Sequence, residues 1–374
     1  MMSGATTQCV KLRPQNSGIV NNKASIRVVS GSDVASRMPD WEAWFEQGDW
    51  NLHSLNPRWL QVLCESFNHT PHCVELSKND ECTAVLPLAG IKSLMFGRFL
   101  VSLPYLNVGG VLGGDCVEKA TVIRAAASLA DSLGVDHLQL RNEKRVDEPL
   151  FNQELTSKLH MRLSLPQSES ELWDQLKSKV RSQIRKGFKQ EIEVDWGGQE
   201  MIGDFYAIFA RKMRDLGTPV FAKSLFTNIA GAFPESSEFC VCRIGSTPIA
   251  AAMLLHGKGI TEVPSASSIS KYNSTNVNML MYWSLLCRAV ERGQSTFDFG
   301  RTTEGSATHR FKKQWGAQPH PSVWQYYVRG DAEEKGPDDF RPESGTYARA
   351  VRLWKRLPLP VANLLGPHIV RGIP

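Results

Sequence analysis

The sequence of 374 residues lacks an apolar run long enough to cross a lipid bilayer, and its polar first 25 residues do not resemble a signal peptide. Its eight cysteines include no CxxC pair, and its nine histidines show no metal-ligand spacing. The net charge of +5 permits a phosphate-bearing partner without requiring one. These absences favour a cytoplasmic protein with reduced thiols, no metal site and no stable membrane insertion.

We expect two domains, because the chain exceeds the length at which a single hydrophobic core keeps growing. Helices and antiparallel-looking strands predicted over residues 26–165 recur in the same order over residues 166–330. We therefore expect an α+β fold in which two similar domains, each with a mostly antiparallel sheet, face each other across a cleft. Residues 1–25 are expected to be a flexible tail, and residues 331–374 a linker and helical segment that packs back on the first domain.

One stretch, TFDFGRTTEGSATHRFKKQWGAQP at 296–319, concentrates the polar chemistry of the chain. Its first residues predict a strand in which Asp298 points away from the two flanking phenylalanines. Arg301 then opens a small polar loop, after which Lys312 and Lys313 follow within a few residues. This grouping indicates a site for an anionic or carbonyl substrate, although a solvated hairpin with an ion pair would give the same pattern.

Two further segments are candidates for binding. The segment PYLNVGG at 104–110 ends in paired glycines, which allow a backbone to approach a ligand closely and also occur in plain turns. A helix predicted after the capping-box sequence at 168–171 is strongly basic, as a phosphate-binding helix or a solvated face would be. The substrate-binding candidates from these segments are Tyr105, Asn107, Gly109, Gly110, Arg185 and Lys186.

The motif FDFGR at 297–301, followed by RFKKQWG at 310–316, resembles the FemAB-like proteins, and most closely the FemAB-related proteins associated with exosortase/PEP-CTERM polysaccharide systems. Further matching blocks are SLPYLNVGG at 102–110, KVRSQIRK at 179–186, KMRDLGTP at 212–219 and NMLMYW at 278–283. The resemblance implies two tandem domains of the GNAT acyltransferase fold. It also adds Asn278, Arg301 and Lys313 to the candidate substrate-binding residues.

Acyl transfer to an amine requires a base for the amine proton and stabilisation of the negative charge that develops on the carbonyl oxygen. The sequence shows no Ser-His-Asp order and no reactive-cysteine context, so direct attack is the simpler mechanism. The resemblance implies that Lys312 stabilises the oxyanion. Asp298 or Glu262 is the candidate base, and Glu262 lies on the predicted strand where GNAT-type enzymes often place one.

The acyl donor is expected to be a co-substrate, either aminoacyl-tRNA or acyl-CoA, with no bound cofactor. Acetyl-CoA is in doubt because the turn at 267–276 contains no glycine to receive its pyrophosphate. The expected function is N-acyl transfer to an amine-bearing cell-envelope, peptidoglycan or exopolysaccharide precursor, with tRNA as a possible contact. The alternatives are an acetyl-CoA-dependent N-acetyltransferase acting on an amino sugar and a non-catalytic scaffold protein of a polysaccharide export system.

Overall fold

The computed structural model describes residues 24–94, 96–330 and 345–373, so the tail expected at the N-terminus and most of the expected linker lie outside the described residues. The first part of the chain forms β1 (Ala24–Ser30), α1 (Asp33–Gln47), η1 (His53–Leu55), α2 (Trp59–Phe67), β2 (Thr70–Lys78), β3 (Glu81–Ser93), β4 (Gly97–Val101), β5 (Leu112–Gly113), α3 (Cys116–Leu133), β6 (His137–Asn142) and β7 (Gln153–Ser164).

The second part forms α4 (Glu169–Gln175), α5 (Ser178–Phe188), β8 (Ile192–Gly197), η2 (Gln199–Met201), α6 (Ile202–Leu216), α7 (Lys223–Ala232), β9 (Ser237–Ile244), β10 (Thr247–His256), β11 (Ile260–Ser268), η3 (Ser270–Thr275), α8 (Val277–Glu291), β12 (Thr296–Thr303), α9 (Ala307–Gln314) and β13 (Gln318–Val328). The helices α10 (Gly345–Trp354) and α11 (Leu359–Val370) follow.

The strands form two copies of one pattern. In the first half, β1, β2, β3 and β4 pair antiparallel in sequence order, and β4 then pairs parallel with β6 after the crossover helix α3. In the second half, β8, β9, β10 and β11 pair antiparallel, and β11 pairs parallel with β12 after α8. The expected α+β repeat is therefore confirmed.

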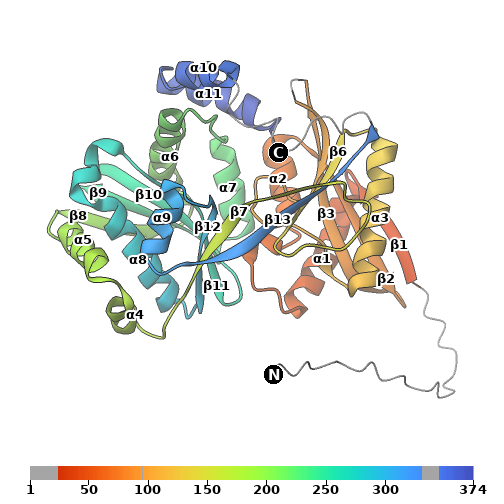
Figure 1. Ribbon diagram of the computed structural model, residues 1–374, viewed down its shortest axis with the longest axis horizontal. Coiled ribbons are helices and arrows are strands. Elements are labelled where there is room, and N and C mark those ends of the chain that lie inside the picture. Colours follow the sequence, from red (N-terminus) through yellow and green to blue (C-terminus); the bar gives the residue numbers. More distant parts are fainter. Residues whose placement is uncertain (1–23, 95, 331–344, 374) are drawn as a thin grey trace, which may run out of the picture.

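The two halves share one hydrogen-bonded sheet, which corrects the expectation of two separate sheets. The chain exchanges strands: β7 pairs with β12 of the second half, β13 pairs with β6 of the first, and β7 and β13 pair with each other. Figure 1 shows these two long strands crossing the middle of the molecule. Each exchanged strand covers an edge, at β6 or β12, that would otherwise leave backbone groups unpaired. A boundary at residue 165 therefore separates chain segments but not structural units.

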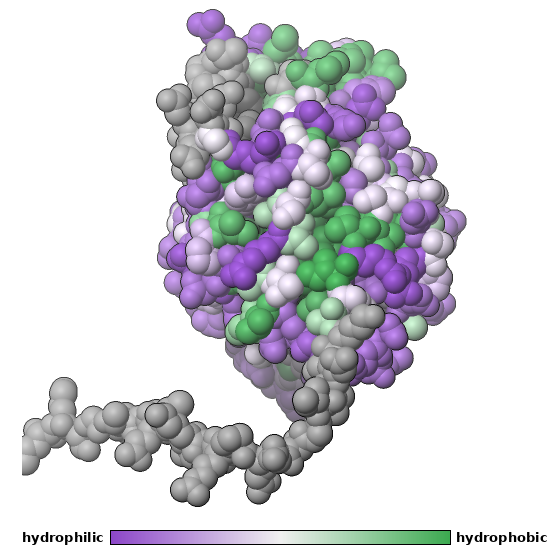
Figure 2. Space-filling view, turned by 90° about the vertical axis from the view of Figure 1, so that its right-hand side faces the viewer, coloured by the Kyte–Doolittle hydropathy of each residue, from purple (hydrophilic) through white to green (hydrophobic). Residues whose placement is uncertain are grey.

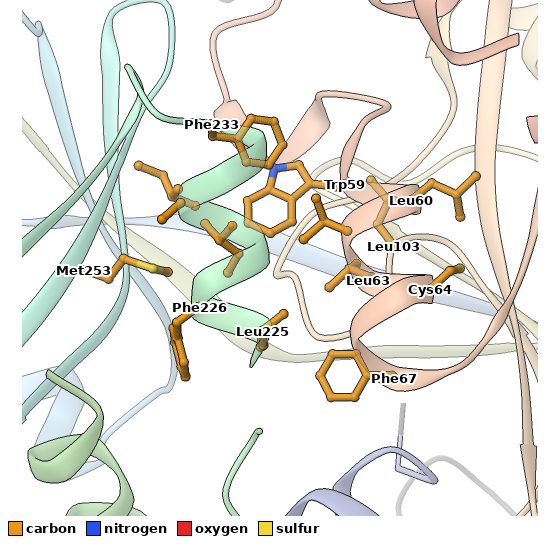
Figure 3. Close-up of a cluster of buried hydrophobic side chains, with 14 of the residues drawn as sticks. Trp59, Leu60, Leu63, Cys64, Phe67, Leu103, Leu225, Phe226, Phe233 and Met253 are labelled. Carbon is orange, nitrogen blue, oxygen red and sulfur yellow. The ribbon is translucent and has the colours of Figure 1, made fainter. Parts of the chain in front are cut away.

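Packed side chains fill much of the space between the halves, and the expected cleft is reduced to a small cavity. One buried cluster contains Trp59 and Leu63 of α2 together with Phe226 of α7 and Phe233, which follows that helix. Figure 3 shows Trp59, Leu63 and Phe233 between the two helices, whereas Phe226 lies on the other side of α7. The Trp59 ring lies 4.9 Å from that of Phe233, centroid to centroid. The two halves are therefore in direct hydrophobic contact.

The C-terminal helices pack mainly on the second half, which corrects the expected docking on the first. The α11 helix lies against α6, and Arg214 Nη1 of α6 donates a hydrogen bond to the Leu357 carbonyl at 3.0 Å. The end of the chain reaches the first half, where the Tyr105 hydroxyl donates to the Arg371 carbonyl at 3.0 Å. Hydrophobic residues lie at the upper edge of the molecule in Figure 2, and Leu353 and Leu364 of these helices are exposed. Within the described ranges, no helix has both the length and the apolar character needed to cross a bilayer.

Candidate active site

A cavity of about 70 Å³ lies where the two halves meet. Its lining comes from η1 and the loop after β4 in the first half, and from β10, β11 and β12 in the second. The lining residues are Ser54, Tyr105, Leu106, Asn107, Leu255, Glu262, Val263, Pro264, Asp298 and Gly300. Four of the predicted site residues, Tyr105, Asn107, Glu262 and Asp298, are therefore brought together although up to 193 positions separate them in the sequence.

Two carboxylates stand side by side in the cavity wall, because Glu262 of β11 is the register partner of Asp298 of β12. Asp298 accepts hydrogen bonds from Arg162 Nε at 2.9 Å and from the Gly300 N–H at 2.7 Å. Arg162 also pairs with Glu143. Both carboxylate oxygens of Asp298 are thus occupied by hydrogen-bond donors.

Glu262 has a different environment. The Ser54 N–H donates to its Oε2 at 2.9 Å, and no arginine or lysine among the described residues forms an ion pair with it. Burial, together with the negative charge of Asp298, raises the pKa of Glu262 from its ordinary value of 4.5 to about 7. A carboxylate with a pKa near neutrality can take and release a proton at physiological pH. Of the two predicted bases, the geometry therefore favours Glu262, with Asp298 as the neighbour that raises its pKa.

Lys312 lies on the helix α9 and not in an extended segment. The helix forms because the Ser306 hydroxyl caps its N-terminus and accepts the His309 N–H at 3.1 Å. Lys312 Nζ is buried and donates to the carbonyls of Gly300 at 2.9 Å and Arg301 at 3.1 Å. Burial lowers its pKa to about 8, an effect that the charge of Asp298 opposes. The ammonium is thus held beside Gly300, a cavity residue.

Lys313 is exposed on the same helix, whereas Lys312 is buried. Four other predicted binding residues outside the 104–110 loop are also absent from the cavity lining: Arg185, Lys186, Asn278 and Arg301. Arg185 lies on α5 with its Cζ 5.2 Å from the centroid of the Trp173 ring, and Lys186 is exposed. Asn278 lies in the first turn of α8.

The basic face of α5 provides a test of phosphate binding at a distance from the cavity. If it contacts a phosphate-bearing donor, the double substitution Arg185→Glu and Lys186→Glu should weaken donor binding, and the loss should grow as the salt concentration falls. The measurement is a binding titration at several salt concentrations. The control is Lys92→Glu with Lys144→Glu, which changes the net charge equally at exposed sites in the first half. Equal binding by both double variants would assign the α5 face to solvent.

The glycine pair of the loop does not line the cavity, which corrects the prediction for Gly109 and Gly110. A Cβ on Gly109 would lie 2.7 Å from Leu103 Cβ, and one on Gly110 would overlap Asn142 Oδ1. The Gly109 N–H also donates to the Arg141 carbonyl at 2.8 Å. The glycines therefore let the loop pack closely on β6, which in turn places Tyr105 and Asn107 at the cavity.

This packing changes the expected outcome of substitution at Gly110. Gly110→Ala should lower the melting temperature, because the added methyl group must displace Asn142 in a closely packed region, and overpacking costs about 1–3 kcal/mol. The control is Gly203→Ala in α6, where a Cβ would meet no atom within 4 Å, and which should leave stability unchanged or raise it. Thermal melts of both variants make the comparison. A stable Gly110→Ala protein with a raised KM would instead restore a ligand-binding role.

Sequence reasoning missed several groups around the cavity. Ser54 comes from a short 3₁₀ helix with no motif, and Arg162 lies on the exchanged strand β7, whose place in the sheet the sequence does not reveal. Arg141 of β6 is 2% exposed, and nothing in the mostly polar strand sequence HLQLRN indicates that this arginine is buried. Trp324 of β13 donates from Nε1 to the Asn107 carbonyl at 3.3 Å and so supports the loop.

The structure also bears on the donor, because GNAT-type domains are expected to receive pyrophosphate at the helix that follows the fourth strand of each repeat. In the first half, the α3 N-terminus is occupied by Asp115, which accepts the N–H groups of Val117 and Glu118. In the second half, the turn before α8 is the glycine-free 3₁₀ helix η3. The α3 start follows Gly113 and Gly114, but the Asp115 carboxylate takes its N–H groups, and the turn before α8 has no glycine.

Comparison with known proteins agrees with this architecture. A family profile described as "Acetyltransferase (GNAT) domain" matches residues 175–313. Among solved structures, FemX is similar over 78% of this chain and 96% of its own, with a TM-score of 0.60 and 12% identity. A tandem GNAT protein from the clavulanic acid biosynthesis pathway covers 82% of this chain and 99% of its own, at a TM-score of 0.51 and 10% identity.

The structure of L-PGS from Bacillus licheniformis is similar over 85% of this chain and 97% of its own, with a TM-score of 0.52 and 12% identity. Comparison with curated protein sequences finds no match. The matched domain and the repeated sheet define a tandem GNAT-fold protein, the fold of N-acyltransferases. The shared fold of FemX agrees with the resemblance of the chain's motifs to FemAB-like proteins.

Proposed function

We propose that this protein is an N-acyltransferase that transfers an aminoacyl or acyl group from an activated donor to an amine of a cell-envelope, peptidoglycan or exopolysaccharide precursor. The observation that carries the proposal is the cavity between the halves, where a carboxylate with a pKa of about 7 faces the same space as Gly300, whose carbonyl Lys312 binds. A base and a fixed cation at one cavity are the two groups that direct aminolysis requires.

The proposed reaction proceeds without a covalent enzyme intermediate. The amine nitrogen attacks the donor carbonyl carbon, and Glu262 accepts the proton that the nitrogen loses. The tetrahedral intermediate carries negative charge on the former carbonyl oxygen. Two of the three N–H groups of Lys312 are used by backbone carbonyls, so one remains for this oxygen. The intermediate then collapses, the bond to the donor oxygen or sulfur breaks, and the leaving group takes up the proton.

Two classes of donor are candidates. The Asp115 carboxylate at the start of α3 and the glycine-free turn before α8 favour an aminoacyl ester, such as aminoacyl-tRNA, and the basic α5 offers a surface for its phosphates. The match to the acetyltransferase profile favours a second candidate, an acyl-CoA-dependent transfer to an amino sugar. A panel of aminoacyl-tRNAs and acyl-CoAs, assayed for binding and for single-turnover transfer to amine-bearing precursors, separates the two. Failure of all donors to bind would favour the scaffold alternative.

A further inference from the structure

Two arginines that have no carboxylate partner among the described residues meet at one tryptophan beside the cavity. Arg141 Cζ lies 4.1 Å from the centroid of the Trp324 ring, and Arg301 Cζ lies 3.5 Å from it. Arg141 is 2% exposed, and Arg301 is partly exposed. Both therefore contact a single aromatic ring at the junction of β6, β12 and β13.

The hydrogen-bonding groups of this pair are largely unused. Arg141 Nη1 donates to the Leu106 carbonyl at 2.8 Å, but its Nε and Nη2 have no partner among the described residues. Arg301 Nη1 is likewise buried without a partner in the described part of the chain. By contrast, the half-buried Arg162 near the cavity is paired with both Asp298 and Glu143. The contrast marks the Arg141–Arg301 pair as exceptional in this site.

Leaving two guanidinium groups together in a buried place is unfavourable, because each loses hydration and each repels the other. Burial and the charge of Arg301 lower the pKa of Arg141 to about 9, and burial lowers that of Arg301 to about 10. A bound anion would offset both costs. Guanidinium groups match carboxylate and phosphate oxygens with paired hydrogen bonds.

The pair lies directly behind one wall of the cavity. Gly300, which precedes Arg301, lines the cavity, as does Leu106, whose carbonyl accepts from Arg141. Asn107, whose carbonyl accepts from Trp324, lines it as well. The loop that carries these groups is held in an unusual shape, with the non-glycine residues Leu103 and Tyr105 at φ 43° and 67°. An anion that reached Arg301 from the cavity would place its carrier beside Glu262.

We propose that Arg141 and Arg301, stacked on Trp324, form a binding site for an anionic group, a phosphate or a carboxylate, of the substrate that reacts in the cavity. This inference rests on the proposed function, which supplies the substrate, and it adds that the substrate carries an acidic group. Arg301 contacts the anion, and Arg141 supplies positive charge and hydrogen bonds from behind it.

The test uses the full-length protein and measures binding rather than turnover. Inorganic phosphate, pyrophosphate and succinate are titrated against sodium chloride at matched ionic strength, and the melting temperature is followed. We expect a saturable rise with at least one probe. Arg301→Met and Arg141→Met should each weaken the apparent affinity roughly tenfold or more, as loss of a charge-assisted hydrogen bond does. Arg310→Met, an exposed arginine on α9, is the control and should bind like wild type.

Stability without any probe separates a binding role from a structural one. If Arg141 is a charge held for a ligand, Arg141→Met should melt at or above the wild-type temperature in chloride alone, because an unpaired buried charge is removed. A structural role predicts a lower temperature. If Arg141→Met fails to fold, Arg141→Lys replaces it in the test. This variant keeps the positive charge but loses the planar guanidinium group, so it should still bind the anion, but more weakly.

The outcomes distinguish the ligand sources and the two hypotheses. Stabilisation by phosphate or pyrophosphate alone indicates a nucleotide- or lipid-linked phosphate, and stabilisation by succinate indicates a peptide or sugar acid. No saturable effect of any probe, or unchanged affinity in both methionine variants, would overturn the anion site. Anion binding in a protein that transfers no acyl group would leave this inference standing and reject the proposed function instead.

Discussion

Replacing Lys312 is expected to reduce kcat by roughly 10²–10³, the effect of removing one donor to a developing oxyanion. The ammonium stabilises the charged tetrahedral intermediate more than the neutral carbonyl, so the loss should fall on kcat rather than on substrate affinity. Lys312→Met is the preferred variant because it keeps most of the buried aliphatic stem of the side chain. Single-turnover transfer and substrate binding, once a donor is known, measure the two effects separately.

The neighbouring lysine is the matched control. Lys313 is exposed on the same helix, and Lys313→Met should transfer at nearly the wild-type rate. Because Lys312 also holds the carbonyls of Gly300 and Arg301, a thermal melt must show that Lys312→Met remains folded. A folded Lys312→Met protein that turns over within a few-fold of wild type would remove Lys312 from the catalytic groups and leave it a structural role.

Replacing Glu262 is expected to change the pH dependence as well as the rate. A base must be deprotonated to act, so wild-type kcat/KM should rise with pH through about 7, the raised pKa of Glu262. Glu262→Gln should lose this limb and lower the rate by roughly 10²–10⁴, the usual contribution of a general base. The measurement is a pH–rate profile of both proteins, with Glu304→Gln, at an exposed position after β12, as the control.

The same carboxyl group gives a stability signature that needs no substrate. Its folded-state pKa is raised, so its contribution to the free energy of unfolding is fully present below about pH 4.5 and is lost as pH rises through about 7. Wild type should therefore lose stability over this range relative to Glu262→Gln, which cannot ionise. Denaturant melts from pH 4 to 8 test this. Parallel stability curves for the two proteins would show that Glu262 titrates normally and is no base.

Several features of the candidate site could be predicted from local sequence. The alternation around Asp298, the capping signals and the repeated order of helices and strands placed most elements correctly. The motifs also placed Tyr105, Asn107, Glu262 and Asp298 in one site, and the cavity contains all four. Lys312 and Lys313 point in different directions, as adjacent residues do on a helix and on a strand alike.

Other features depend on contacts between distant segments. Nothing local shows that β7 and β13 exchange between halves, since every pairing partner of each strand lies more than 130 residues away. The glycines at 109 and 110 suggested a ligand because the sequence does not show that Asn142 and Leu103 fill the space beside them. The pKa of Glu262 likewise depends on burial and on Asp298, which become neighbours only in the sheet.

The sequence by itself determined the α+β repeat and the residue types available for acyl transfer, because hydrophobic periodicity, capping and turn residues act over a few positions. Only the tertiary structure decided that the two repeats share one sheet, that Glu262 lies beside Asp298, and that Arg141 joins Arg301 at Trp324. Hydrogen-bond satisfaction, desolvation and charge proximity decide these points. All three are properties of neighbours in space, which a linear pattern does not specify.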